Sequence, residues 1–188
     1  MEQEENRALV FAEHQEIVTP RLRLRPVTLA DAQDMFAYAG DEETTRFVFL
    51  AHQTLVDTRK AIATYFMAAP FGKYGIEEPG SGKLIGTIDL RVQKSAAELG
   101  YVLNKTYWGK GYVPEAAQVL LKLGFEEMNL ARIFALRDVR NQASKRVMEK
   151  IGMKQEGVLA SAGIRKGEIL DVAIHAITHE RWMQQAIV

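Results

Sequence analysis

Two glycines one residue apart could form a binding site for a phosphate group. Gly109 and Gly111 lie in segment 107–117, which follows an apolar run at 99–103 and precedes an amphipathic run at 119–125. This pattern predicts a strand, a glycine loop and a helix. Glycines permit a sharp turn and leave main-chain N–H groups uncovered. The helix start adds unpaired N–H groups and a positive dipole end, which together favour a phosphate-bearing ligand.

A glycine pair between a strand and a helix is also common in simple tight turns. The loop lacks the third glycine of a dinucleotide fingerprint, because Pro114 stands there, and it lacks the hydroxyl residue of a nucleotide-triphosphate loop. A second glycine cluster, Gly80 to Lys83, lacks that hydroxyl too, since Leu84 follows Lys83. We interpret this second cluster as a hairpin tip. The rest of the chain must decide the role of the first.

The composition indicates an ordinary soluble domain. The 188 residues are 47% hydrophobic and 26% charged, which is enough to bury one core. Lys plus Arg equals Asp plus Glu at 24 each, so the net charge predicts neither a nucleic-acid partner nor an acidic membrane surface. An acidic start and short apolar runs predict no secretion signal and no membrane span.

The absence of cysteine limits the possible chemistry. Without cysteine there is no disulfide, no thiol nucleophile and no thiolate metal site, and the composition fits a cytoplasmic protein. His175 and His179 are four residues apart, but they fall on a predicted strand and its exit without a third ligand nearby. We expect core packing or exposure for both histidines, and no metal.

The order of predicted elements describes one domain after a short leader. We expect a polar leader at 1–17 and a single domain at 18–188, with no repeat or linker. The predicted elements are a strand at 18–26, helices at 28–40 and 54–69, antiparallel strands at 71–76, 84–92 and 97–103, the glycine loop and its helix, a strand at 132–137, a helix at 141–151, and strands at 153–159 and 169–177 joined by a loop at 161–167.

This order resembles the GNAT acetyltransferases. The motif at 107–112 is followed about thirty residues later by Asn141, Ser144 and the run 147–153, and this pair of motifs is similar to the Rim-type branch, which contains ribosomal-protein N-terminal acetyltransferases. The resemblance covers about residues 18–182. It implies an α/β (α+β) GNAT fold, with a mixed, mostly antiparallel sheet of about six to seven strands, splayed central strands and about four main helices.

The resemblance also implies the co-substrate and the residues that bind it. The donor would be acetyl-CoA and the acceptor an amine, either a protein N-terminus or a small amine. The glycine loop would hold the pyrophosphate, Val102 and Leu103 would pair with the pantetheine arm, and Asn141 would bond the arm or cap its helix. The loop residues concerned are Trp108, Gly109, Lys110, Gly111, Tyr112 and Val113. Pro114 removes one candidate donor.

Direct acetyl transfer requires a base and an acid. Glu98 matches a catalytic glutamate in some members of the superfamily and could act through a water, although an exposed strand carboxylate would look the same in sequence. Asp89 on the neighbouring strand is the second candidate for the base.

The acid is less easily assigned. Many members have a tyrosine where this chain has Met148, which cannot donate a proton. Ser144 could protonate the leaving sulfur or could simply bond its own helix. A further glutamate of some Rim-type enzymes would fall close to Gly163.

Two functions therefore share the glycine loop. The favoured one is an N-acetyltransferase that works by direct attack in a ternary complex. The alternative is a catalytically weak acetyl-CoA-binding module that acts as a sensor or partner protein, which the replacements at Met148, Pro114 and Gly163 would allow. The sequence is compatible with a monomer or a homodimer.

Overall fold

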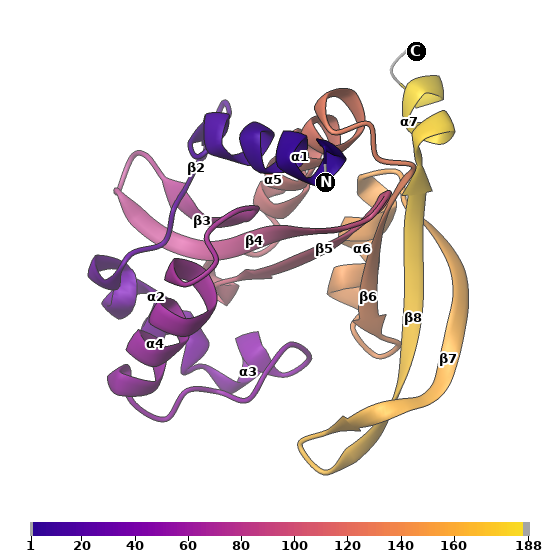
Figure 1. Ribbon diagram of the computed structural model, residues 1–188. Coiled ribbons are helices and arrows are strands. Elements are labelled where there is room, and N and C mark those ends of the chain that lie inside the picture. Colours follow the sequence, from indigo (N-terminus) through magenta and orange to yellow (C-terminus); the bar gives the residue numbers. More distant parts are fainter. Residues whose placement is uncertain (1, 186–188) are drawn as a thin grey trace. The chain divides into compact units, whose positions relative to one another are not determined.

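The computed structural model describes residues 2–185. Contacts between residues group the chain into two compact units. The first unit contains residues 1–89 and 101–116, and the second contains 90–100 and 117–188. The division falls within two strands, β4 and β5, which are labelled in Figure 1. The single domain predicted for residues 18–188 stays a prediction.

The first unit combines an antiparallel sheet with short helices. Its elements are α1 (Glu2–Glu13), β1 (Ile17–Val18), β2 (Arg23–Arg25), η1 (Leu29–Asp31), α2 (Ala32–Ala39), α3 (Glu42–Thr45), α4 (Leu55–Ala61), η2 (Ile62–Met67), β3 (Lys73–Glu78), most of β4 (Lys83–Gln93), the end of β5 (Ala96–Leu103), η3 (Lys105–Tyr107) and the start of α5 (Tyr112–Lys122). Thr54 and Asp57 form a capping box at α4, at the start of the helix expected at 54–69.

Strands β1, β2, β3 and β4 pair antiparallel in that order. Leu24 pairs with Ile17 on one side and with Ile76 on the other, and both Leu24 and Ile76 are fully buried. The turn between β3 and β4 contains Gly82 at a φ of +66°, in the left-handed region that favours glycine. The interpretation of Gly80 to Lys83 as a hairpin tip is therefore confirmed.

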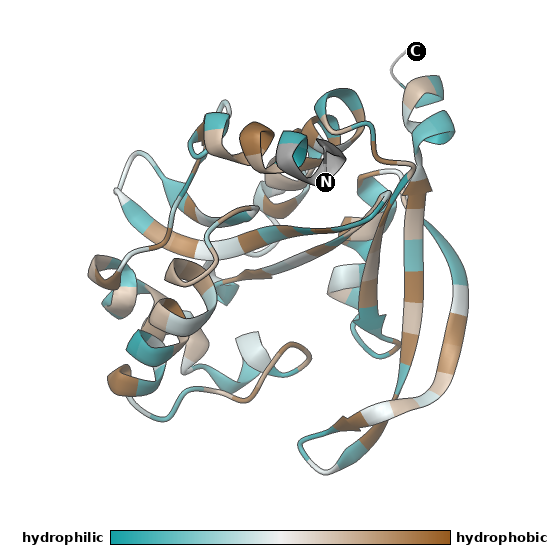
Figure 2. Cartoon of the chain, in the orientation of Figure 1, coloured by the Kyte–Doolittle hydropathy of each residue, from teal (hydrophilic) through white to brown (hydrophobic). Residues whose placement is uncertain are grey.

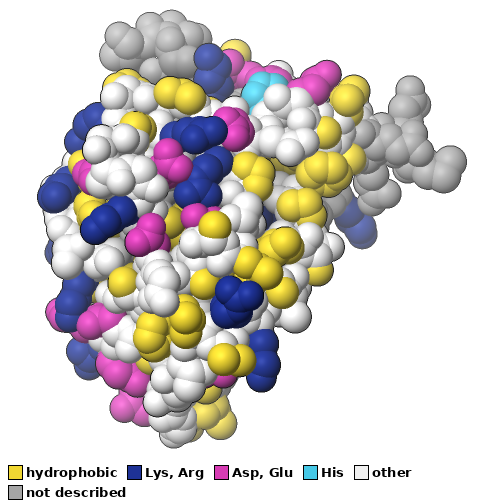
Figure 3. Space-filling view, turned by 90° about the vertical axis from the view of Figure 1, so that its left-hand side faces the viewer, with side chains coloured by type: hydrophobic (Ala, Val, Ile, Leu, Met, Phe, Trp, Pro, Cys, Tyr) yellow, Lys and Arg dark blue, Asp and Glu magenta, His cyan; other side chains and the backbone are white. Residues whose placement is uncertain are grey.

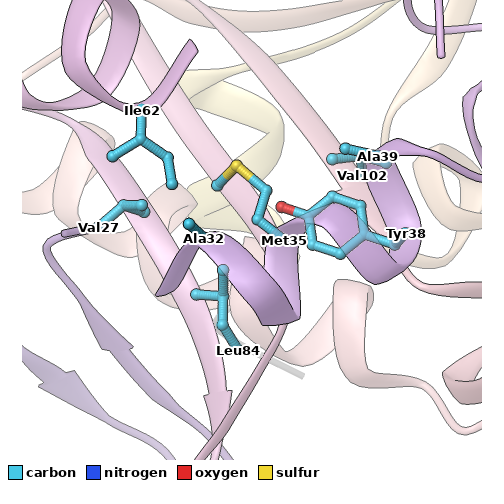
Figure 4. Close-up of a cluster of buried hydrophobic side chains, with 8 residues drawn as sticks. All are labelled: Val27, Ala32, Met35, Tyr38, Ala39, Ile62, Leu84 and Val102. Carbon is cyan, nitrogen blue, oxygen red and sulfur yellow. The ribbon is translucent and has the colours of Figure 1, made fainter. Parts of the chain in front are cut away.

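A cluster of apolar side chains fills the core of the first unit (Figure 4). Helix α2 contributes one face of the cluster, at helical spacing, and η2, β4 and β5 contribute the facing side chains. The members are Val27, Ala32, Met35, Tyr38, Ala39, Ile62, Leu84 and Val102. This packing anchors the end of β5 through Val102, directly before the glycine loop.

The second unit is built around a long hairpin. Its elements are the end of β4, the start of β5, the rest of α5, η4 (Leu123–Glu127), β6 (Arg132–Asp138), α6 (Gln142–Lys150), β7 (Lys154–Arg165), β8 (Glu168–Thr178) and α7 (His179–Gln185). Figure 2 shows β8 as a largely hydrophobic strand interrupted by hydrophilic positions. Strand β8 pairs antiparallel with β6 along Arg132–Asp138 and with β7 on its other edge.

Strands β5 and β6 pair in parallel over a short stretch. Ala96, Ala97 and Glu98 face Arg132, Ile133 and Phe134, and the ladder ends there although both strands continue. All other pairings described between neighbouring strands are antiparallel. The prediction of a mixed, mostly antiparallel sheet with splayed central strands is therefore confirmed.

Three details of the fold differ from the sequence-based expectation. Within residues 2–185 the hydrogen-bonded order is β1-β2-β3-β4-β5-β6-β8-β7, which makes eight strands rather than six to seven. Helices α1, α3 and α7 add to the four main helices predicted. The prediction of a loop at 161–167 is wrong, because β7 continues to Arg165 across a bulge between Leu159 and Gly163. An irregular, glycine-containing run resembles a loop in sequence although it pairs in the sheet.

Charged side chains of both signs lie side by side on the face in Figure 3, as the equal totals of acidic and basic residues lead one to expect. Within residues 2–185, no helix combines the length and the apolar composition needed to cross a membrane.

Candidate active site

The glycine loop of the first unit has the geometry that its sequence predicts. Gly109 and Gly111 have φ angles of +78° and +81°, both in the left-handed region, and α5 begins at the next residue, Tyr112. Apart from Gly109 and its two chain neighbours, no heavy atom lies within 4 Å of the position that a Cβ would take at Gly109. The loop is therefore held in a conformation that suits glycine, with open space along one side.

The first turn of α5 leaves main-chain donors unused. The first helical hydrogen bond runs from the Glu115 N–H to the Gly111 carbonyl at 3.1 Å. The N–H groups of Tyr112 and Val113 lie before Glu115, whose N–H is the first to donate within the helix, so they have no partner within it. Pro114 has no N–H, so it costs the helix no hydrogen bond at this position. Two adjacent donors at a helix start suit an anionic ligand.

A network that the sequence did not reveal supports this loop. Arg21 donates from Nη1 to the Lys110 carbonyl at 2.9 Å and from Nε to Glu115 at 2.6 Å. Glu115 also accepts from the Thr19 hydroxyl at 2.6 Å. Burial alone would raise the pKa of the Glu115 carboxyl, but the hydrogen bonds from Thr19 and Arg21 outweigh burial and lower the pKa. Glu115 is therefore held ionised beside the loop.

Aromatic side chains surround the same loop. The Lys110 ammonium lies 4.9 Å from the centre of the Tyr107 ring, and Tyr112 donates its hydroxyl to Glu78 at 3.2 Å. Trp108 is 43% exposed and donates from Nε1 to the Leu103 carbonyl at 2.7 Å. Trp108 thus ties the loop to the end of β5 and leaves much of its ring accessible to a ligand.

The side chains of Val102 and Leu103 are buried, so only their main-chain groups could meet a ligand. The Leu103 carbonyl already accepts the bond from Trp108. Gly86 explains how β4 approaches this point, because a Cβ there would collide with the Val102 carbonyl oxygen. Gly86 is a positioning residue that sequence reasoning missed. A glycine inside an alternating strand indicates that another backbone approaches closely, and this signal was present in the sequence.

Glu98 belongs to the second unit, where pairing decides its orientation. It lies opposite Phe134, whereas its neighbour Ala97 lies opposite Ile133 and is fully buried. Glu98 therefore shares the partly exposed face of Phe134, and its carboxylate forms an ion pair with Arg91 at 2.8 Å. The second candidate, Asp89, lies in the first unit and accepts a hydrogen bond from the Tyr65 hydroxyl at 2.9 Å.

Asn141 caps helix α6 in the second unit. Its side-chain oxygen accepts from the Ser144 N–H at 3.0 Å, which is the structural role that sequence reasoning left open, and its amide NH₂ group is a separate donor. The Ser144 side chain is partly exposed, and Met148, one turn further on, is buried in the core. Met148 is therefore a packing residue.

An acidic residue before this helix was also missed. The side chain of Asp138 is 1% exposed, and Oδ1 accepts from both the main-chain N–H and the Nε of Arg140 at 2.9 Å. Hydrogen bonding from Arg140 lowers the pKa of the Asp138 carboxyl, despite burial. Arg140 also bonds Glu168 on β8 at 2.7 Å. These bonds connect the loop before Asn141 to the β7–β8 hairpin.

The structure thus gathers the predicted residues into two groups. The first unit holds Val102, Leu103 and the loop Trp108, Gly109, Lys110, Gly111, Tyr112 and Val113, which are joined by the Trp108 bond. The second unit holds Glu98, Asn141 and Ser144, with Asn141 and Ser144 bonded to each other.

Neither of the two spaced histidines belongs to a metal-binding group among the described residues. His175 is 1% exposed in the core of the second unit, and His179 begins α7 and stacks on Phe125 with 5.8 Å between ring centres. Trp182 stacks on the same ring at 5.6 Å, so it packs α7 against Phe125.

Comparison with known proteins agrees with this geometry. Residues 21–154 match the family model described as an acetyltransferase (GNAT) domain. The chain is 34% identical over 168 residues to the N-acetyltransferase YnaD of Bacillus subtilis, across 88% of this chain and 98% of that protein. It is 31% identical over 170 residues to YoaA of the same organism, across 87% and 96% of the two chains.

Solved structures show the same fold. A GNAT-family acetyltransferase from Bacillus anthracis superposes with a TM-score of 0.80 at 34% identity, covering 88% of this chain and 99% of that one. The family uses acetyl-CoA as its co-substrate, and the paired left-handed glycines beside a helix start fit the phosphate-bearing part of that molecule. The chain belongs to the GNAT acetyltransferase family and is an acetyl-CoA-dependent acyltransferase.

Proposed function

We propose that the enzyme transfers the acetyl group of acetyl-CoA to a primary amine, either a protein N-terminal α-amine or a small amine, within a ternary complex. The observation that carries the proposal is the glycine loop, with its two left-handed glycines and the free N–H groups at the start of α5. A diphosphate needs several convergent donors, and this segment supplies them from the main chain. The residues concerned are Trp108, Gly109, Lys110, Gly111, Tyr112 and Val113.

The pantetheine arm would lie along the end of β5. The parallel ladder between β5 and β6 stops at Glu98 and Phe134, although β5 continues to Leu103. Main-chain groups beyond that point can pair with an amide-containing arm as an added strand would. Because the side chains of Val102 and Leu103 are buried, their contribution is main-chain hydrogen bonding. Asn141 in the second unit is the residue that the family resemblance assigns to this arm, and its amide NH₂ is a donor that the capping of α6 does not use.

Glu98 is the proposed base. The amine must lose a proton before its nitrogen attacks the thioester carbonyl, and Glu98 accepts that proton directly or through a water. Its accessible side chain on the face of Phe134 supports this role. Collapse of the tetrahedral species breaks the C–S bond and releases the CoA thiolate, which takes a proton as it leaves, and the extra proton still on the attacking nitrogen restores the group that donated it. Ser144 is the proposed donor, because its side chain is partly exposed and Met148 has no acidic proton.

Both classes of acceptor have a counterpart among similar proteins. The spermidine N(1)-acetyltransferase of Escherichia coli is 26% identical over 76 residues, which supports a small amine. A ribosomal L7/L12 α-N-protein acetyltransferase superposes with a TM-score of 0.76 at 20% identity, a likeness of fold alone. The Rim-type motifs at 107–112 and 141–153 favour the N-terminal amine. We also propose a cytoplasmic location and a monomer or homodimer.

Thermal unfolding with and without acetyl-CoA tests the binding step. Ligand at about a hundred times its dissociation constant adds about 2.7 kcal/mol to the free energy of unfolding, so a clear upward shift of Tm is expected. No shift at about millimolar ligand would contradict the proposed loop site. Release of CoA thiol is then followed with peptides bearing a free α-amine, with the same peptides N-acetylated, and with polyamines. Turnover with the acetylated peptides would rule out the N-terminal amine as acceptor.

A further inference from the structure

We infer that Arg21 and Glu115 are positioning residues that aim the main-chain N–H groups of the glycine loop at the phosphates of acetyl-CoA. The inference rests on the proposed role of the loop in binding pyrophosphate. It assigns a function to two residues that neither touch the reacting atoms nor belong to the predicted site. Both residues lie in the first unit.

The loop requires an external support because of its glycines. Gly109 and Gly111 both occupy the left-handed region, and glycine has more accessible backbone conformations than any other residue. A free loop of this kind would sample many orientations of its peptide groups. Binding would then carry the entropic cost of ordering them, which a preformed loop avoids.

Arg21 holds the peptide group between Lys110 and Gly111. Its Nη1 donates to the Lys110 carbonyl at 2.9 Å. In a planar trans peptide the C=O and N–H bonds point in opposite directions. Turning the Lys110 carbonyl toward Arg21 therefore turns the Gly111 N–H away from Arg21 and leaves it available as a donor.

Glu115 fixes both Arg21 and the next peptide group. Its carboxylate accepts from Arg21 Nε at 2.6 Å and from the Arg21 main-chain N–H at 3.0 Å. Its own N–H bonds the Gly111 carbonyl at 3.1 Å, which by the same geometry directs the Tyr112 N–H outward from α5. The ion pair thus orients the donor at Gly111, and the main-chain bond of Glu115 orients the next donor, at Tyr112.

Two further contacts keep the ion pair in place. The Arg21 guanidinium lies 4.9 Å from the centre of the Tyr112 ring, and the Thr19 hydroxyl donates to Glu115 at 2.6 Å. The Arg21 side chain is nevertheless 48% exposed, and ion pairs this exposed contribute little to the free energy of unfolding. The effect of losing Arg21 should therefore appear in ligand binding rather than in stability.

The test compares acetyl-CoA with S-acetyl-pantetheine, which lacks the pyrophosphate. For Arg21→Ala we expect the KM for acetyl-CoA to rise about tenfold, because one charge-assisted hydrogen bond that orients the loop is lost. The kcat should stay within about twofold of wild type. The kcat/KM for S-acetyl-pantetheine should stay within about twofold. Arg21→Lys keeps the charge but loses the forked geometry, so it should recover only part of the affinity.

The pair should act as a unit. Glu115→Ala should raise the KM for acetyl-CoA as Arg21→Ala does, and the double variant should be no worse than the more severe single variant, because both remove the same support. Arg23→Ala is the matched control. Arg23 lies two residues further along the chain and pairs with Glu16 at 2.8 Å rather than with the loop, so its kinetic constants should match wild type.

The outcomes separate this inference from the proposed function. If the wild-type enzyme had the same kcat/KM for acetyl-CoA and S-acetyl-pantetheine, this would contradict pyrophosphate binding by the loop. The inference about Arg21 and Glu115 would then be wrong as well. A wild type that prefers acetyl-CoA, with Arg21→Ala retaining the full preference, would overturn the inference alone. If Arg21→Ala lowered kcat/KM equally for acetyl-CoA and for S-acetyl-pantetheine, Arg21 would have a merely structural role, and this result would also overturn the inference. Thermal unfolding without ligand confirms that each variant is folded.

Discussion

The Glu98 carboxylate and the Arg91 guanidinium form an ion pair at 2.8 Å, with each side chain about one-third exposed. The pair lies in the second unit, and Glu98 faces the same side of the sheet as Phe134. Arg91 holds the carboxylate in one orientation while leaving it accessible. An oriented, accessible carboxylate suits a base that receives a proton from an incoming amine or from a water.

Replacing Glu98 by glutamine should reduce turnover and leave donor binding intact. Gln keeps the shape of the side chain but cannot accept the proton, so kcat near neutral pH should fall about a hundredfold, the lower range for a general base. The dissociation constant for acetyl-CoA, measured by calorimetry, should stay within about twofold. Glu156→Gln, which removes an exposed carboxylate paired with Arg132 in the same unit, is the control. Equal rates for Glu98→Gln and wild type would eliminate Glu98 as the base.

Alanine at Gly109 should weaken acetyl-CoA binding and destabilise the protein slightly. The position has room for a Cβ, so the cost comes from the φ of +78°, and the free energy of unfolding should fall by about 1 kcal/mol. Gly82→Ala provides a matched control, because Gly82 has a φ of +66° and equal space but lies in the β3–β4 turn. Urea unfolding should give similar losses for both variants. Only Gly109→Ala should raise the KM for acetyl-CoA, and a rise in both would contradict a specific role for the loop.

Two substitutions at Asn141 can separate helix capping from ligand binding. Aspartate also caps helices well, so Asn141→Asp should leave stability nearly unchanged, whereas Asn141→Ala should cost about 1 kcal/mol. Aspartate lacks the amide NH₂ group, so Asn141→Asp should still raise the KM for acetyl-CoA if that group bonds the pantetheine arm. Thermal unfolding and steady-state kinetics on both variants give the answer. An unchanged KM in Asn141→Asp would leave Asn141 with capping alone.

His175 should make the protein less stable in mild acid. Its side chain is 1% exposed, and neither ring nitrogen has a hydrogen-bond partner among the described residues. Burial, followed by the charge of Arg137, lowers the pKa of this histidine; Lys145 acts in the same direction and Glu149 against it. The unfolded chain therefore binds a proton at a higher pH than the folded chain does.

The lowered pKa of His175 makes the free energy of unfolding fall as the pH falls. Stability from the neutral histidine is fully present above the unfolded pKa of about 6.5 and is lost as the pH falls toward the lowered folded pKa. Urea unfolding between about pH 5 and pH 8 should show this decline in wild type and a flatter profile in His175→Leu. His179→Gln, which alters a half-buried histidine at the start of α7, should keep the wild-type slope. Identical slopes in wild type and His175→Leu would contradict the prediction.

Local sequence determined the elements whose signals are short in range. The glycine loop, the start of α5 and the cap of α4 by Thr54 and Asp57 follow from residue types a few positions apart, because backbone conformation and capping are local interactions. The hairpin tip at Gly82 was predictable for the same reason. Paired motifs at the loop and at Asn141 then identified the family and its co-substrate.

Tertiary structure alone decided the features that join distant residues. Arg21 and Glu115 are 94 positions apart, and no periodicity in the sequence relates them. The face on which Glu98 lies depends on pairing with Phe134, since a shift of one residue in register reverses every side chain of a strand. Strand β7 runs through 161–165 only because a bulge opposite β8 accommodates the extra residues. Side-chain direction and long-range pairing are set by the packed sheet, which is why residue type and spacing could suggest a candidate site but not the contacts that support its loop.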